Sequence, residues 1–161
     1  MRTVIVFLFT FFCISDIIYL IKNKLFTQFT IERKCKLMQK KFYRCNVCGN
    51  IVGLIRDGGG ELVCCGQPME LLVPGTSDGA AEKHVPVYEL DGDCLSVTVG
   101  SVPHPMTPEH YIQWIMVTQK GRTQRVELTP EDKPSAKFII DPSVPFAVFE
   151  YCNLHGLWET E

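Results

Sequence analysis

The hydrophobic and polar residues beyond position 87 alternate in short runs, which is the pattern of strands that bury one face. An Asp91-Gly92 turn and a Lys120-Gly121 turn each separate two such runs, so each turn predicts a β-hairpin. Prolines and glycines lie between the runs, and no stretch has the spacing of a long amphipathic helix. The expected strands are 88–90, 94–99, 111–119, 123–128, 137–140 and 146–151.

Short strands at these intervals favour an antiparallel β-sandwich of the immunoglobulin-like type. The chain of 161 residues is long enough for one such sandwich and a small module, and its hydrophobic content of 46% is enough to form a core. We therefore expect a mainly β protein in which the sandwich, residues 75–161, is the larger part.

Residues 38–74 predict a small module ahead of the sandwich. Cys45-Asn46-Val47-Cys48 forms a tight turn, residues 50–56 form a short expected strand, and residues 61–63 return the chain to Cys64-Cys65. The resulting hairpin would bring the two cysteine pairs together. So short a segment buries too little apolar surface to fold alone, and a bound metal would supply the missing stability.

The N-terminal extension, residues 1–37, has three interpretations. Residues 3–21 are almost wholly apolar, with Asp16 inside the run, and their length is near the ~20 residues that span a bilayer. A signal peptide would need a small-residue cleavage site after the run, and none follows. A membrane anchor would leave the body in the cytoplasm, because most basic residues of the extension follow the run. In the third interpretation, translation begins at Met38 and the extension is never made.

Charge is distributed unevenly along the chain. The extension carries a net charge of +4, and the remaining 124 residues carry −6. Nucleic-acid binding requires a clustered basic face, so this acidic body with scattered lysines argues against nucleic acid as a partner.

Eight cysteines would suit a disulfide-bonded protein, but their spacing favours metal binding. Cys45 and Cys48 are too close to cross-link much chain, and the adjacent Cys64 and Cys65 cannot easily pair with each other without strain. Four thiolates bind one zinc or iron ion, so a structural zinc knuckle and a redox-active iron site both remain open. The adjacency of the second pair should distort the angle between its sulfurs.

The histidines form a second candidate site, because each of them lies in a loop or at the end of an expected strand. Loops at one end of a sandwich can converge on a point, although four unrelated surface histidines are the alternative. The members of the site are His84, His104, His110, Cys152 and His155. Cys94 lies inside an alternating strand and is expected in the core.

Four imidazoles and one thiolate would leave the sixth position of an octahedral iron open to a small substrate. A thiolate donates electron density to the metal, so we hypothesise that Cys152 favours release of a peroxide product. Exchanging Cys152 for serine should then abolish turnover while the histidines still hold metal.

Six motifs carry a family resemblance. They are Cys45-x-x-Cys48-Gly49-Asn50, Cys64-Cys65-Gly66, Glu82-Lys83-His84-Val85-Pro86, His104-Pro105-Met106, Glu109-His110-Tyr111 and Cys152-Asn153-Leu154-His155-Gly156. Through them, 124 of the 161 residues, 38–161, resemble desulfoferrodoxin, the two-iron superoxide reductase. The resemblance implies a desulforedoxin-like module at 38–74 and a catalytic sandwich at 75–161, and it leaves residues 1–37 outside the family pattern.

The resemblance also implies two iron ions per chain and a role for each candidate residue. A rubredoxin-like iron would be bound by Cys45, Cys48, Cys64 and Cys65. A catalytic iron would have His84, His104, His110 and His155 in its equatorial plane and Cys152 as its axial ligand. Glu82 would occupy the sixth position in the resting ferric state, and Lys83 would attract the superoxide anion and help to deliver a proton. Without the resemblance, Glu82 and Lys83 would be taken as a solvated loop pair.

The implied activity is reduction of superoxide to hydrogen peroxide, a defence against oxygen stress in an anaerobe. A rubredoxin-like electron donor and a homodimer follow from the same resemblance. A cytoplasmic body is expected from the basic residues that follow the apolar run, with membrane anchoring through residues 1–37 as the alternative. Because the acidic body repels an anion, Lys83 would act only within the ~8–10 Å screening length, together with the charge of the iron. Other candidate functions are a one-electron carrier, a structural zinc protein and a superoxide dismutase.

Overall fold

The computed structural model describes residues 40–160. The apolar run 3–21 lies outside the described residues, as do Cys13 and Cys35, so the interpretations of the extension stay predictions. Within residues 40–160, no helix is long and apolar enough to cross a membrane. All elements described below belong to one compact unit, residues 38–161.

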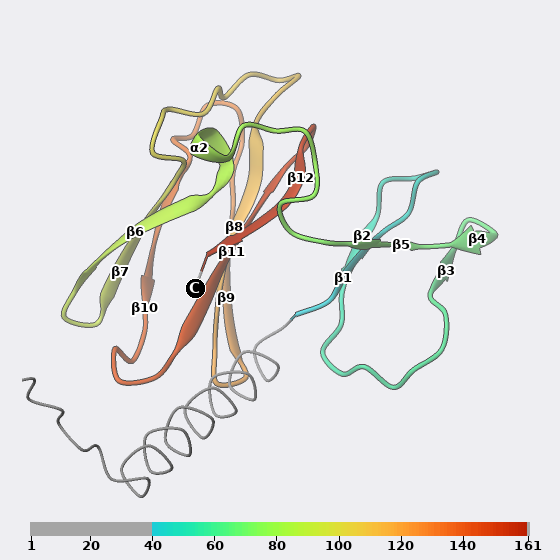
Figure 1. The fold of residues 1–161 in the computed structure, drawn as a ribbon, viewed down its shortest axis with the longest axis horizontal. Helices are drawn as coiled ribbons and strands as arrows, with labels where there is room; N and C mark the ends of the chain where they lie inside the picture. Colours follow the sequence, from blue (N-terminus) through green and yellow to red (C-terminus); the bar gives the residue numbers. More distant parts are fainter. Residues whose placement is uncertain (1–39, 161) are drawn as a thin grey trace, which may run out of the picture. The chain divides into compact units, whose positions relative to one another are not determined.

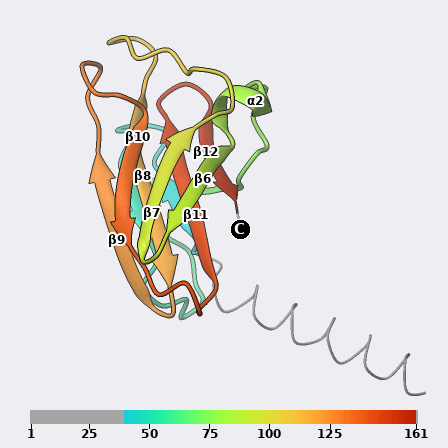
Figure 2. The same ribbon diagram turned by 90° about the vertical axis from the view of Figure 1, so that its left-hand side faces the viewer.

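Seven strands form two antiparallel sheets that lie face to face as a sandwich (Figures 1 and 2). The three-stranded sheet has the order β10-β7-β6, and the four-stranded sheet has the order β12-β11-β8-β9. The strands are β6 (Pro86–Asp91), β7 (Cys94–Val99), β8 (Ile112–Gln119), β9 (Arg122–Glu127), β10 (Ser135–Ile139), β11 (Phe146–Cys152) and β12 (Gly156–Thr160). The prediction of a mainly β protein with an antiparallel sandwich is confirmed.

The alternation in the sequence places apolar side chains between the two sheets. Leu95, Val97 and Val99 of β7 are at most 1% exposed, and they share one core cluster with Ile115 and Val117 of β8. Burying such side chains is the main source of stability for a sheet that has one apolar face.

Strand β11 buries both of its faces. Val148 and Cys152 belong to the core between the sheets, whereas Phe149 belongs to a second cluster that includes Phe42 of the cysteine module. The ring of Phe42 lies 5.5 Å from the ring of Phe149 and 5.5 Å from that of Trp114, measured between centroids. The strand that ends in Cys152 is therefore held by packing from two sides.

Strand β12 is not among the strands expected from the sequence. Its adjacent residues Leu157 and Trp158 are both buried, because Leu157 packs in the cluster of Phe42 while the Trp158 ring stacks on His84. A strand with two buried faces has no alternation of polar and apolar residues, so the periodic signal is missing.

The cysteine module consists of two small β-elements. Strands β1 (Phe42–Arg44), β2 (Ile51–Gly53) and β5 (Glu70–Leu72) form a sheet in the order β2-β1-β5, and β3 (Val63–Cys64) pairs with β4 (Gln67–Pro68). The expected hairpin between residues 50–56 and 61–63 is wrong. Strand β1 satisfies the backbone of β2 on one edge and of β5 on the other, and β3 turns back on β4 instead.

A single turn of helix, α2 (Ala81–His84), leads directly into β6. It carries Glu82, Lys83 and His84, of which only His84 is buried. The carbonyl oxygen of Glu82 accepts a hydrogen bond from the Val102 amide at 3.0 Å. This bond ties the helix to the loop that follows β7.

Candidate metal centres

Five side chains from separate segments converge in one cluster. His84 comes from α2, Cys152 from the end of β11, and His155 from the turn between β11 and β12. The other two, His104 and His110, come from the loop between β7 and β8. One nitrogen of each histidine and the Cys152 sulfur all lie within 4.8 Å of one another. The structure thus brings together every member of the second candidate site.

The four imidazole rings form a square. Neighbouring centroids, in the order His84, His104, His110, His155 and back to His84, are 4.6 to 4.8 Å apart. The diagonal between His84 and His110 is 6.3 Å, close to that of a square with these sides. Neighbouring rings are inclined by 70 to 78°. Rings set in this way can each direct one nitrogen to a shared centre, as four equatorial ligands do.

Backbone carbonyl groups fix which nitrogen each of two rings presents to the centre. The Nδ1 of His84 lies 2.8 Å from the carbonyl oxygen of Ala80, and the Nδ1 of His104 lies 2.6 Å from that of Pro105. A carbonyl only accepts, so both Nδ1 atoms carry hydrogen and both Nε2 atoms present a lone pair. The two Nε2 atoms are 3.1 Å apart, where facing lone pairs repel unless a cation lies between them. The arrangement fits a metal ion bound through Nε2.

Burial keeps the imidazoles in the form that binds metal. His84 is 1% exposed and His104 is 5% exposed. Burial lowers the pKa of His104 to about 4, and it also lowers the pKa values of His84 and His110. These rings are therefore neutral at pH 7. The Nε2 of His110 is buried with no hydrogen-bond partner within residues 40–160, and a metal ion would satisfy it.

The fifth donor is the fully buried thiol of Cys152. Its Sγ lies 3.6 Å from the Nδ1 of His155. Burial raises the pKa of Cys152, and the backbone amides of His155 and Leu154 oppose that rise in part. A bound cation deprotonates a coordinating thiol, so this site also fits a metal by its charge.

Asn153 joins the two loops that carry His110 and His155. Its Oδ1 accepts a hydrogen bond from the Tyr111 amide at 2.9 Å, and its Nδ2 donates to the carbonyl of Glu109 at 2.9 Å. Sequence reasoning gave this side chain no role. A signal in the sequence could have indicated this role. Asn153 lies between Cys152 and His155, and asparagine side chains in loops commonly form hydrogen bonds with backbone groups.

Glu82 and Lys83 directly precede His84 on the helical turn α2, and both are exposed. Burial is the largest cause of the lowered pKa values of His84 and His110. The charge of His155 lowers them further, and the positive charge of Lys83 makes a smaller contribution in the same direction. The positive charge of Lys83 therefore acts on both of these rings.

The four thiols of the cysteine module form a separate cluster within 4.8 Å. The Sγ atoms of Cys48 and Cys64 are 3.7 Å apart, and those of Cys64 and Cys65 are 3.9 Å apart. Four sulfurs around one ion at bonds of about 2.3 Å are ~3.8 Å apart, whereas disulfide sulfurs are ~2.05 Å apart. The cluster fits one tetrahedral metal ion, and no disulfide joins any of the six described cysteines.

Hydrogen bonds lower the pKa of one thiol of this cluster and raise the pKa of another. The amides of Cys48 and Val47 lower the pKa of Cys45 to about 6. Hydrogen bonds with neighbouring thiols, that of Cys48 above all, raise the pKa of Cys65 to about 12. Four thiolates this close repel one another, so a cation is needed to hold all of them.

The adjacency of Cys64 and Cys65 is accommodated in the backbone. The 3.9 Å between their sulfurs is close to the ~3.8 Å expected between two ligands of a tetrahedral ion. The main chain is where the conformation is unusual, because Cys65 adopts a left-handed φ of 52°. Non-glycine residues rarely adopt this conformation, so the strain lies in the main chain and not in the expected sulfur angle.

Comparison with known proteins identifies matching family models over nearly all of the described chain. A model described as desulfoferrodoxin matches residues 76–161, and one described as desulfoferrodoxin, N-terminal domain, matches residues 38–72. The chain is 54% identical over 119 residues to the desulfoferrodoxin of Syntrophotalea carbinolica, which covers 74% of this chain and 94% of the relative. It is 40% identical over 104 residues to the superoxide reductase of Pyrococcus horikoshii, covering 53% of this chain and 90% of that protein.

A solved structure has the same architecture. The crystal structure of the superoxide reductase from Treponema pallidum matches with a TM-score of 0.63 and 34% sequence identity. The match covers 76% of this chain and 99% of that chain. The two family models, the high identity to full-length relatives and the two ligand clusters agree: this chain belongs to the desulfoferrodoxin family.

Proposed function

We propose that the protein is a superoxide reductase, an oxidoreductase that reduces superoxide to hydrogen peroxide at the histidine-cysteine site. The observation that carries the proposal is the square of four imidazoles with two facing Nε2 lone pairs and one buried thiol. This donor set suits iron, and the four thiols of the module suit a second iron. The family membership supports two iron ions per chain.

The roles of the individual ligands follow from their surroundings. The catalytic iron would be held by the imidazoles of His84, His104, His110 and His155 and by the thiolate of Cys152. The Ala80 and Pro105 carbonyls would keep two of the rings in the required tautomer. Bound ferrous iron would supply the single electron that superoxide accepts.

The charged pair on α2 would guide the substrate and the proton. Reduction of superoxide to hydrogen peroxide consumes one electron and two protons. Lys83 would attract the anion against the negative net charge of the body and would help to deliver a proton. Glu82 would supply a carboxylate that could serve as a further ligand to the ferric iron. The adjacency of both residues to His84 supports this assignment.

The second iron would serve electron transfer. Cys45, Cys48, Cys64 and Cys65 would bind it, and Cys48 and Cys65 are exposed, so a donor protein can approach the sulfurs. We propose a rubredoxin-like donor, a homodimeric assembly and a cytoplasmic body. Residues 38–74 would form the desulforedoxin-like domain and residues 75–161 the catalytic domain, a division supported by family models that end at 72 and begin again at 76.

Exchange of the metal tests the proposed function. The protein should be loaded with iron or with zinc in parallel and mixed with superoxide. Zinc has no redox chemistry, so only the iron-loaded protein should consume superoxide beyond the spontaneous rate. Equal consumption by both forms, or by neither, would exclude the proposed enzyme. Consumption by neither form would leave a one-electron carrier or a structural metal protein.

A further inference from the structure

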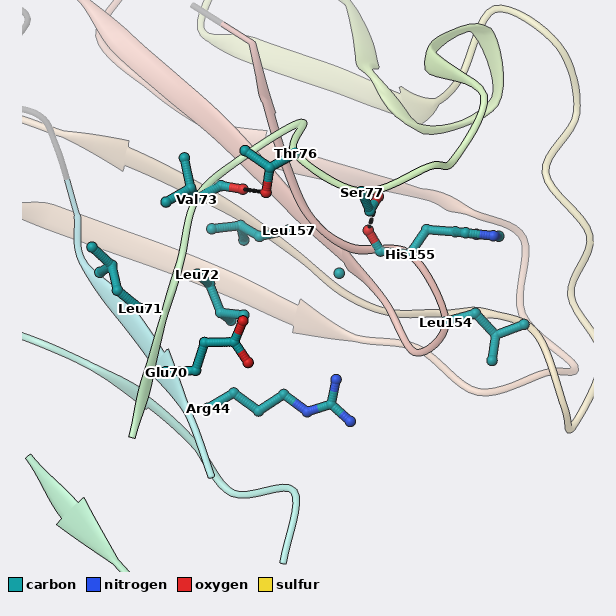
Figure 3. Close-up of a pocket in the computed structure, with 11 residues that line it drawn as sticks. Arg44, Glu70, Leu71, Leu72, Val73, Thr76, Ser77, Leu154, His155 and Leu157 are labelled. Atoms are coloured by element: carbon teal, nitrogen blue, oxygen red, sulfur yellow. Dashed lines mark hydrogen bonds between the residues drawn. The ribbon is translucent and has the colours of Figure 1, made fainter. Parts of the chain in front are cut away.

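Residues 75–79, which we call the strap, connect the cysteine module to helix α2. The strap forms hydrogen bonds with His155 and with the start of β12. The Gly75 amide donates to the carbonyl of Leu157 at 2.9 Å. The Ser77 hydroxyl donates to the carbonyl of His155 at 2.5 Å. Figure 3 shows this contact, with the His155 ring directed away from Arg44 and Glu70. The strap therefore holds the main chain of a proposed ligand while leaving its ring free to face the metal.

The His155 carbonyl accepts a second hydrogen bond. The Nε1 of Trp158 donates to it at 3.1 Å. Two donors on one carbonyl oxygen restrict rotation of the peptide group and hence the direction in which the side chain leaves the backbone. The Nδ1 of this ring lies 3.6 Å from the Cys152 sulfur, so a small rotation of the His155 backbone would change the ligand geometry.

Trp158 contacts a second histidine of the square as well. Its ring stacks on that of His84, with centroids 5.0 Å apart and an interplanar angle of 19°. Trp158 is 5% exposed, so it is fixed by its surroundings. One indole thus contacts two of the proposed ligands, His84 from α2 and His155 from the turn after β11.

Gly79 allows the strap to approach this closely. A Cβ at this position would lie 2.9 Å from the Cβ of His155 and 3.0 Å from the Cζ2 of Trp158. Any larger residue would therefore push the strap away from both side chains. The need for glycine is a need for space against the His155 turn.

We propose that Ser77, Gly79 and Trp158 form a clamp that sets the orientation of His155 and His84. They are positioning residues, because they act on the metal site through these two histidines. The clamp rests on the proposed function only in that the histidines bind metal. The strap, which links the cysteine module to helix α2, would then also support the histidine site.

The clamp can be tested by removing its two hydrogen-bond donors while an aromatic ring is kept at position 158. In Ser77→Ala the hydroxyl is lost, and in Trp158→Phe the N–H is lost while a ring remains over His84. The control is Thr76→Ala, because the neighbouring Thr76 hydroxyl donates its hydrogen bond to the carbonyl of Val73. Ser77→Thr keeps a hydroxyl and should restore the behaviour of the unaltered protein.

The measurement is the release of ferrous iron to a chelator from the iron-loaded full chain, together with the thiolate absorption of each centre. Loss of an outer partner of a metal ligand typically weakens metal binding 10–100-fold, so the double variant should release iron from the histidine site about tenfold faster. Its absorption from Cys152 should shift, while the absorption of the four-cysteine centre should match that of Thr76→Ala. Gly79→Ala should act in the same direction.

Three results would overturn the clamp. Release and absorption equal to those of Thr76→Ala would show that the donors do not position the ligands. Parallel loss of iron from both centres would indicate a general loss of stability. If Ser77→Thr releases iron as fast as Ser77→Ala does, the hydroxyl at position 77 does not position His155. If the unaltered protein binds no iron at the histidine site, the proposed function fails before the clamp is tested.

Discussion

Replacing Phe42 with alanine tests how the cysteine module is attached to the sandwich. Phe42 is 4% exposed, and its ring packs against Trp114 and Phe149. It belongs to the cluster that covers the outer face of β11, the strand that ends in Cys152. The substitution should therefore weaken both the module and the support of the strand that carries Cys152.

The expected loss follows from the size and burial of the side chain. Removing a buried phenylalanine ring costs about 3–5 kcal/mol, because apolar burial is lost and a cavity remains. Part of the surroundings is a three-stranded sheet that can relax, so we expect a loss near the lower limit, about 3 kcal/mol. Phe42→Leu keeps most of the volume and should lose about 1 kcal/mol.

Urea unfolding of the zinc-loaded protein, followed by tryptophan fluorescence, measures this loss. With a slope of about 2 kcal/mol per molar, the midpoint should fall by about 1.5 M for Phe42→Ala. Ile55, which is 96% exposed, provides the control, and Ile55→Ala should change stability by less than about 0.5 kcal/mol. A Phe42→Ala loss no larger than that of Ile55→Ala would refute the packing argument.

Four further predictions concern the charged and sulfur groups. Lys83→Ala should slow the reaction of the iron-loaded protein with superoxide and flatten the salt dependence of its rate. The control Lys137→Ala makes the same charge change on β10 and should do neither. Equal rates for the two variants would contradict the proposed role of Lys83. Cys152→Ser should end turnover while metal analysis still finds iron at the histidines, and continued turnover would sink the proposed role of the thiolate. Cys48→Ser should remove the thiolate absorption of the module and lower its melting temperature while the histidine site keeps its iron; unchanged absorption would exclude this ligand. The amide and hydroxyl of Thr129 hold the pKa of Asp132 below its ordinary 3.8, so the carboxylate stabilises the fold above that pH and loses the effect as pH falls through the lowered pKa. Asp132→Asn should therefore be less stable at pH 7 and vary less with pH below 4, and an unchanged pH slope would contradict this assignment.

The sequence predicted the sandwich because its strands alternate where one face is buried and the other is exposed. It also predicted which side chains form the two ligand clusters, since cysteine spacing and the placement of histidines at strand ends are visible without a structure. The family motifs added the proposed roles of Glu82 and Lys83, which stay predictions. These are two ordinary charged residues when they are read alone.

Features that depend on contacts between distant segments could not be predicted. Leu157 and Trp158 are adjacent apolar residues, and only the structure shows that they pack against different layers. The pairing of β1 with both β2 and β5 depends on strand register, which the short module does not encode in a periodic pattern. The tautomers of His84 and His104 depend on nearby backbone carbonyls, and the need for Gly79 depends on a turn more than seventy positions away.

The most direct test of the central claim is the stoichiometry of the reaction with superoxide. Residues 38–161, loaded with iron and fully reduced without air, should receive a known dose of superoxide, and the peroxide and oxygen formed should be counted. A reductase yields one peroxide for each superoxide and releases no oxygen, which is the result we predict. Half that yield of peroxide together with released oxygen would mean dismutation and would contradict the proposed function.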